Sequence, residues 1–88
     1  EQIEVREGDL LHGTEGKADV IIANIIADII IMLLKDIPQK LNDDGVFLAS
    51  GIIEERVPDI EAEAQKQGLV VDAIDHRGGW VVMQMRHR

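Results

Sequence analysis

With 88 residues, the chain has room for one small domain, and Phe47 and Trp80 are its only aromatic residues, so aliphatic side chains must build the core. A net charge of −8 argues against binding to nucleic acid, because phosphate backbones repel a strongly acidic surface. The lack of cysteine excludes disulfide frameworks and thiolate metal sites, and no apolar run approaches the roughly 20 residues of a membrane helix.

The first part of the chain predicts two strands joined by a turn. Residues 2–7, QIEVRE, alternate apolar and charged side chains, which is typical of a half-exposed strand. Residues 12–18, HGTEGKA, carry turn chemistry in their glycines. Residues 19–25, DVIIANI, form an apolar run rich in β-branched side chains. Such a run indicates a strand that is buried on both faces of a parallel sheet.

Helical spacing then replaces the strand pattern. Apolar residues recur at helical intervals from residue 26 to residue 41, and Pro38 should kink this helix or start a new turn near its end. Residues 41–45, LNDDG, should stop the helix. Residues 46–50, VFLAS, then form a buried strand that Gly51 ends.

A second helix is expected after this strand. Glu54 and Glu55 favour its positive N-terminus, and Pro58 falls within its first turns, where the missing N–H is tolerated. Residues 57–64 provide a modest apolar stripe, and Gly68 suits the position just past the helix.

The end of the chain predicts a hairpin. Residues 69–75, LVVDAID, and 80–85, WVVMQM, are strands, and the HRGG between them is too short for a crossover helix. The preceding alternation of strands and helices predicts an open parallel sheet with right-handed crossovers. The fold class is therefore α/β, with parallel strands that end in an antiparallel β-hairpin.

Three polar residues follow the predicted parallel strands, where open α/β sheets bind their ligands. Asn24 follows the second strand and is either a helix cap or a ligand contact, and its position alone leaves both open. Asp9 is more simply explained as a turn residue after Gly8. Ser50 can cap the next helix.

Other kinds of site find little support. Residues 48–52, LASGI, lack the first glycine of a hydrolase nucleophile elbow. Asp75 and His76 are of the residue types that form two members of a catalytic triad, but we expect them on a turn at the far side of the sheet. The three histidines show no ligand spacing, so no metal site is expected.

Several segments together resemble the PrmA family of bacterial methyltransferases, which modify protein eleven of the large ribosomal subunit. The resemblance covers nearly all 88 residues. Its most specific parts are Asn-Ile-Ile-Ala at residues 24–27, Ser-Gly-Ile-Ile at residues 50–53, and Trp80-Val81. It implies a Rossmann-like class I fold that uses S-adenosylmethionine.

The resemblance also implies that residues 1–88 are the C-terminal portion of one such domain. The family's strand order is 3-2-1-4-5-7-6 with strand 7 antiparallel, and the strands here correspond to 3, 4, 5, 6 and 7. The glycine-rich cofactor loop and the N-terminal substrate domain have no counterpart, so we expect this chain alone to be inactive. Residues 41–45, LNDDG, depart from the family's more frequent Lys-Pro-Gly-Gly turn.

The functional residues that the resemblance implies are few. Asn24 corresponds to the family's asparagine beside the sulfonium and the incoming amine, and the backbone carbonyl of Ile25 is a second acceptor. Asp9, with its neighbour Leu10, falls near the loop that contacts the adenine. At pH 7, deprotonation of a lysine costs about 4.6 kcal/mol. An uncharged carbonyl can aim the amine's lone pair without stabilising the ammonium form as a carboxylate would.

The implied substrate is a ribosomal protein, methylated on lysine or N-terminal amines in the cytoplasm, with no membrane and no direct nucleic-acid contact. Two alternatives stay open: a non-catalytic α/β interaction module, and a methyltransferase acting on a small-molecule amine. Without the family's first two strands, residues 19–24 should present an exposed apolar edge. We expect residues 1–8 to pair beside that edge or project away, or two chains to associate through it.

Overall fold

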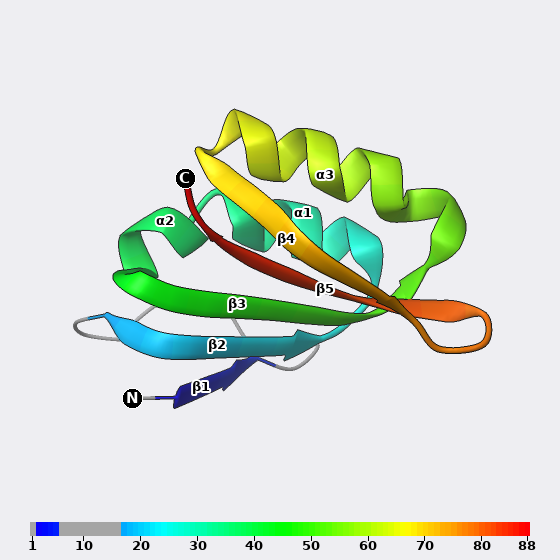
Figure 1. Cartoon of the computed structure of the whole chain (residues 1–88), viewed down its shortest axis with the longest axis horizontal. Helices are drawn as coiled ribbons and strands as arrows, with labels where there is room; N and C mark the ends of the chain where they lie inside the picture. Colours follow the sequence, from blue (N-terminus) through cyan, green and yellow to red (C-terminus); the bar gives the residue numbers. More distant parts are fainter. Residues whose placement is uncertain (1, 6–16) are drawn as a thin grey trace.

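The computed structural model describes residues 2–5 and 17–88 and shows one five-stranded sheet with its helices on one face (Figure 1). Within the described residues, no helix is long and apolar enough to cross a membrane. The elements, in chain order, are β1 (Gln2–Val5), β2 (Ala18–Asn24), α1 (Ala27–Leu34), α2 (Ile37–Lys40), β3 (Leu41–Ile53), the 3₁₀ turn η1 (Glu54–Arg56), α3 (Val57–Lys66), β4 (Leu69–His76) and β5 (Trp80–His87).

The strand order across the sheet is β1-β2-β3-β5-β4. β1, β2 and β3 are parallel, and β5 is antiparallel to both β3 and β4. β4 therefore runs in the same direction as β3. This arrangement confirms the predicted parallel sheet that ends in an antiparallel hairpin.

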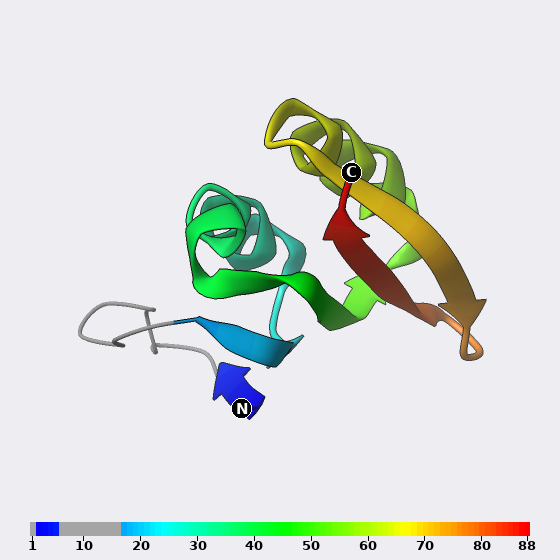
Figure 2. The ribbon, with the colours of Figure 1, turned by 60° about the vertical axis from the view of Figure 1, so that its left-hand side comes forward.

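Figure 2 shows the helices layered on one face of the sheet. The buried side chains of the sheet and of the helices form one core between these layers. On the helix-covered face, Phe47 is the register partner of Ile21 in β2 and of Met85 in β5, and all three are fully buried. α1 adds Ile30, Leu33 and Leu34 to the same core, which matches its helical spacing of apolar residues.

The opposite face of the sheet is less covered than the sequence predicts. The apolar side chains there are only half-buried, so the expectation that β2 is buried on both faces is wrong. Full burial of this face would require a second layer of secondary structure, which the described residues do not supply. The half-buried residues on this face are Val20, Ile22, Val46 and Leu48.

The single long helix that the apolar spacing predicts is divided. α1 ends at Leu34, and α2 begins at Ile37 with Pro38 in its first turn, so Pro38 does start a new turn. Leu41, predicted as helical, instead begins β3 and pairs with Ala18. β3 is consequently longer than residues 46–50, because its backbone keeps pairing with β2 on one side and continues to Ile53 on the other.

β1 covers the outer edge of β2. Its four residues pair in parallel register with residues 20–23, from Gln2 opposite Val20 to Val5 opposite Ala23. Of the three expectations for the first strand, pairing beside residues 19–24 is therefore confirmed. The pairing covers residues 20–23 of the edge on which the expected self-association depended, and β1 becomes the outermost strand.

Candidate functional site

The carboxyl ends of β2 and β3 meet at one edge of the sheet, where Asn24 and Ser50 are register partners. Asn24 is exposed and ends β2. The N-cap position of α1 belongs to Ile26, and no side chain caps that helix. The cap explanation of Asn24 is therefore wrong, and the ligand-contact explanation is left.

The amide of Asn24 lies over Gly51. A Cβ atom placed on Gly51 would lie 2.7 Å from Oδ1 of Asn24 and 3.7 Å from the carbonyl oxygen of Ile25. The two proposed acceptors thus converge around one backbone position. The Asn24 side chain makes no hydrogen bond to any residue in the described ranges, so its donors and acceptor are available to a ligand.

An open pocket of about 220 Å³ lies beside this convergence. Two of its apolar side chains are unusually exposed: Ile26 at 54% and Ile53 at 51%. Concave sites with apolar walls and a few placed polar groups are typical of ligand binding. The lining residues are Ile26, Ala27, Asp28, Gly51, Ile53 and Arg56.

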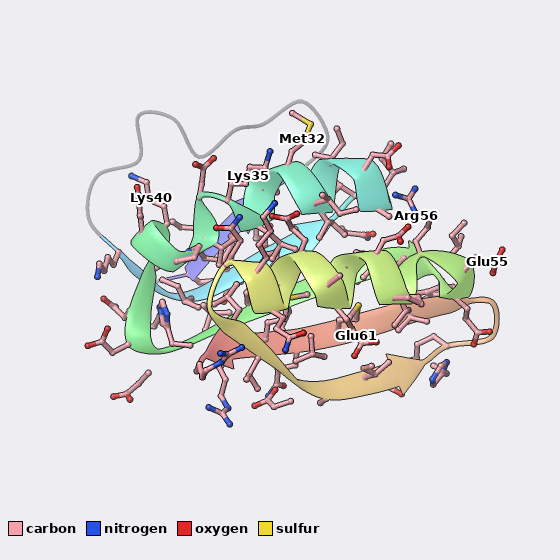
Figure 3. All side chains as sticks on the ribbon, turned by 90° about the horizontal axis from the view of Figure 1, so that it is seen from above. Met32, Lys35, Lys40, Glu55, Arg56 and Glu61 are labelled. Atoms are coloured by element: carbon pink, nitrogen blue, oxygen red, sulfur yellow. The ribbon has the colours of Figure 1, made fainter. Side chains whose placement is uncertain are left out.

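Arg56, which lines the pocket, pairs with a residue of α1 and a residue of α3, and Figure 3 shows it between these helices. Its Nη2 lies 2.7 Å from Oδ1 of Asp28, and its Nε lies 3.0 Å from Oδ2 of Asp59. The hydrogen bonds to Asp28 and then to Asp59 raise the pKa of Arg56 above its ordinary value. The guanidinium thus forms a charged bridge between the first turn of α1 and that of α3.

Replacing Arg56 with glutamine should lower the thermal unfolding midpoint at low ionic strength, since both ion pairs are lost. The difference from the unmodified chain should shrink in 1 M salt, because exposed ion pairs are screened. Scanning calorimetry at both salt concentrations measures this. Lys66→Gln is the matched control, because Lys66 forms no ion pair within the described chain; an equal effect of both substitutions would contradict the bridging role of Arg56.

Ser50 does not cap a helix. Its hydroxyl donates a long hydrogen bond of 3.5 Å to the carbonyl oxygen of Ala23, and the N-cap of η1 is Ile53. The capping prediction is therefore wrong, because β3 continues past Ser50. The hydroxyl instead links the ends of β2 and β3.

Asp75 and His76 are the last two residues of β4, the outermost strand on the side of the sheet opposite β1 and β2. Their predicted place on the far side of the sheet is confirmed, but they end a strand and do not lie on a turn. Because β4 runs parallel to β3, this strand end points the same way as the ends of β2 and β3. His76 Nδ1 lies 2.8 Å from Oε1 of Glu54, whereas Asp75 pairs with Arg77 at 2.7 Å. The two neighbours thus have separate partners and do not form a triad pair.

Asp9 and Leu10 lie outside the described residues. In the described ranges, no three His, Asp or Glu side chains come close enough to hold a metal ion. Sequence reasoning did not assign Gly51 or Arg56 to the site. Gly51 stood in the Ser-Gly-Ile-Ile motif and was a signal for this edge, whereas nothing local to Arg56 indicated that it would reach Asp28.

Comparisons with known proteins identify the family to which the chain belongs. The family model described as ribosomal protein L11 methyltransferase (PrmA) matches residues 1–88. The ribosomal protein L11 methyltransferase of Desulfitobacterium hafniense is 45% identical over 86 residues, covering 98% of this chain and 28% of the relative. That of Caldicellulosiruptor bescii is 40% identical over 82 residues, covering 93% and 27%.

Solved structures show the same relationship. The ribosomal protein L11 methylase of Lactobacillus delbrueckii subsp. bulgaricus is similar with a TM-score of 0.85 and 32% identity, covering 90% of this chain and 42% of that one. A TehB-like SAM-dependent methyltransferase from Corynebacterium glutamicum matches with a TM-score of 0.67 and 16% identity, covering 91% and 52%, which shows the fold alone. The chain thus spans less than a third of the length of the curated relatives described above.

Proposed function

The chain belongs to the ribosomal protein L11 methyltransferase (PrmA) family, and from this premise we propose that it forms part of a protein methyltransferase that uses S-adenosylmethionine. It supplies the C-terminal portion of one catalytic domain. This is in keeping with the match to the Desulfitobacterium hafniense relative, which covers 28% of that protein's length. The substrate is a ribosomal protein of the large subunit in the cytoplasm. The methylated groups are amines, either lysine side chains or an N-terminal amine.

The residues at the carboxyl ends of β2 and β3 fit this role. Gly51 leaves a cradle that a Cβ would fill, and the unbonded Asn24 amide lies in it. When bound, S-adenosylmethionine supplies a methyl group on a positively charged sulfur. In this proposal Asn24 contacts both the cofactor's sulfonium end and the incoming amine, and Asp9 with Leu10 contacts the adenine.

Asn24 and Ile25 position the amine. An amine hydrogen donated to Oδ1 of Asn24, and a second to the carbonyl oxygen of Ile25, would hold the nitrogen with its lone pair pointing in one direction. Both oxygens are uncharged, so they orient the neutral amine without favouring its ammonium form. Orientation of this kind supplies a large share of the rate gain in group transfer. The convergence of the two oxygens around Gly51 is the observation that carries the proposal.

The assay that tests this proposal uses the full-length protein that contains this chain, with S-adenosylmethionine and either ribosomal protein L11 or small amines. Methylation of the protein substrate on amino groups is the expected result. Transfer to small amines alone would show that the substrate is a small-molecule amine and not a protein. Binding of ribosomal protein L11 without methyl transfer would favour a non-catalytic interaction module.

The 88-residue chain alone should bind S-adenosylmethionine weakly or not at all, because it has no counterpart of the glycine-rich loop that holds the cofactor. Isothermal titration calorimetry of the isolated chain measures this. The full-length protein is the positive control, and micromolar affinity of the chain alone would contradict the expectation.

A further inference from the structure

We propose that Gly51 is the positioning residue for the Asn24 amide. Its bare Cα and left-handed backbone leave the space in which that amide is held beside the Ile25 carbonyl. This inference rests on the proposed function for its catalytic consequence, but its structural part stands on the contacts of the chain itself.

The backbone at Gly51 explains why this position is a glycine. Its φ is +79°, inside β3, and the pairing of β3 with β5 shifts register between Ala49 and Ile52. A bulge of this kind bends a strand and re-aims the neighbouring groups, and glycine adopts its left-handed conformation without strain. The bend brings the Gly51 Cα under the end of β2.

The space at Gly51 explains why the position matters to Asn24 in particular. A Cβ there would approach Oδ1 of Asn24 to 2.7 Å, below the 3.0 Å that real Cβ contacts respect. The Ile25 carbonyl oxygen, at 3.7 Å, is at ordinary contact distance and need not move. A methyl group at position 51 therefore displaces one of the two acceptors and leaves the other in place.

A second glycine separates this contact from backbone strain. Gly68 follows α3 with φ +82°, nearly the same φ, but a Cβ there would meet nothing within 4 Å. Gly68→Ala therefore places an alanine at a positive φ without the contact. An effect of Gly51→Ala that depends on the Asn24 side chain and is absent in Gly68→Ala reports the displacement of that neighbour.

The first test is a double-mutant cycle on activity in the full-length protein. Gly51→Ala should lower kcat at least about 10-fold in the presence of Asn24, and by no more than about 2-fold when Asn24 is already alanine. Gly68→Ala should leave kcat within about 2-fold of the unmodified enzyme. An equal loss from Gly51→Ala in both backgrounds, or an equal loss from Gly68→Ala, would overturn the positioning role.

The second test needs no activity. Oδ1 of Asn24 is the far end of a flexible, exposed side chain, so a methyl group at position 51 moves it at little cost in stability. The readout is therefore the place of the amide: in NMR spectra of the 88-residue chain, the side-chain amide resonances of Asn24 should shift in Gly51→Ala and stay in place in Gly68→Ala. Unchanged Asn24 resonances in a folded Gly51→Ala chain, or an equal shift in both variants, would overturn the contact.

The two tests keep the inference separate from the proposed function. A shift of the Asn24 amide resonances in Gly51→Ala, with an Asn24→Ala enzyme that is fully active, would reject the catalytic role of Asn24 and retain the contact with Gly51. A severe activity loss in Asn24→Ala, without coupling in the activity cycle and without that shift, would retain the proposed function and reject Gly51 as the positioning residue.

Discussion

Replacing Asn24 with alanine is expected to lower kcat/KM of the full-length methyltransferase by about 100-fold, the usual cost of losing one well-placed polar group in an active site. The free energy of unfolding should change by less than about 1 kcal/mol, because the side chain is exposed and makes no hydrogen bond to a described residue. Initial-rate kinetics and denaturant unfolding, carried out on the same preparation, give the two numbers.

Asn42 provides the matched control for Asn24. It carries the same amide at the opposite end of β3, where its Nδ2 donates to Oδ1 of Asp19 at 2.6 Å. Asn42→Ala removes that bond and should leave kcat/KM nearly unchanged. A similar activity loss in both variants, or a stability loss in Asn24→Ala that explains its inactivity, would count against the proposed role.

Truncation of Phe47 to alanine is expected to cost about 3–5 kcal/mol of unfolding free energy, as for other large buried aromatic residues. Phe47 is 0% exposed and lies in the middle strand between Ile21 and Met85. Small domains are stable by only about 5–15 kcal/mol in total. Equilibrium unfolding in urea should therefore find the variant at the margin of folding at 25 °C.

Trp80 is the control for this core prediction. It is the chain's other aromatic residue, begins β5 opposite Ile53, and is 44% exposed. Trp80→Ala should cost clearly less than Phe47→Ala despite the larger side chain removed, because less of its surface leaves water on folding. The reverse order would contradict the assignment of Phe47 to the centre of the core.

Local patterns were enough to predict the sheet and its hairpin, because they depend on runs of a few residues. The β-branched run of β2 and the short HRGG connection determine strand and hairpin directly. The break between α1 and α2 was predicted only in part. Pro38 indicated a new turn, but apolar spacing continues across residues 35 and 36 and did not show that α1 ends at Leu34.

The site required long-range geometry. The sequence identified Asn24 as a strand-end residue but left it equally a cap, since deciding between them requires the backbone of α1, whose cap is Ile26. Gly51 lies 27 residues further along the chain, and only the bulge in β3 brings the two together. The length of β4 also depends on its partner: Asp75 and His76 continue the strand into its predicted turn because they pair with Val82 and Val81 of β5.

The crossover between β2 and β3 has a consequence for folding kinetics. His76 and Val81 pair across a short turn, whereas Asn24 and Ser50 pair only after α1 and α2 have been traversed. Loop closure over that longer span costs roughly 1.5 kcal/mol more. We therefore expect the pairing of β2 with β3, which brings Asn24 close to Gly51, to form after the local hairpin. This pairing should be lost only when the β2–α1–α2–β3 unit unfolds. Amide hydrogen exchange at Ala23 and Ala49 should accordingly follow global unfolding rather than local fraying.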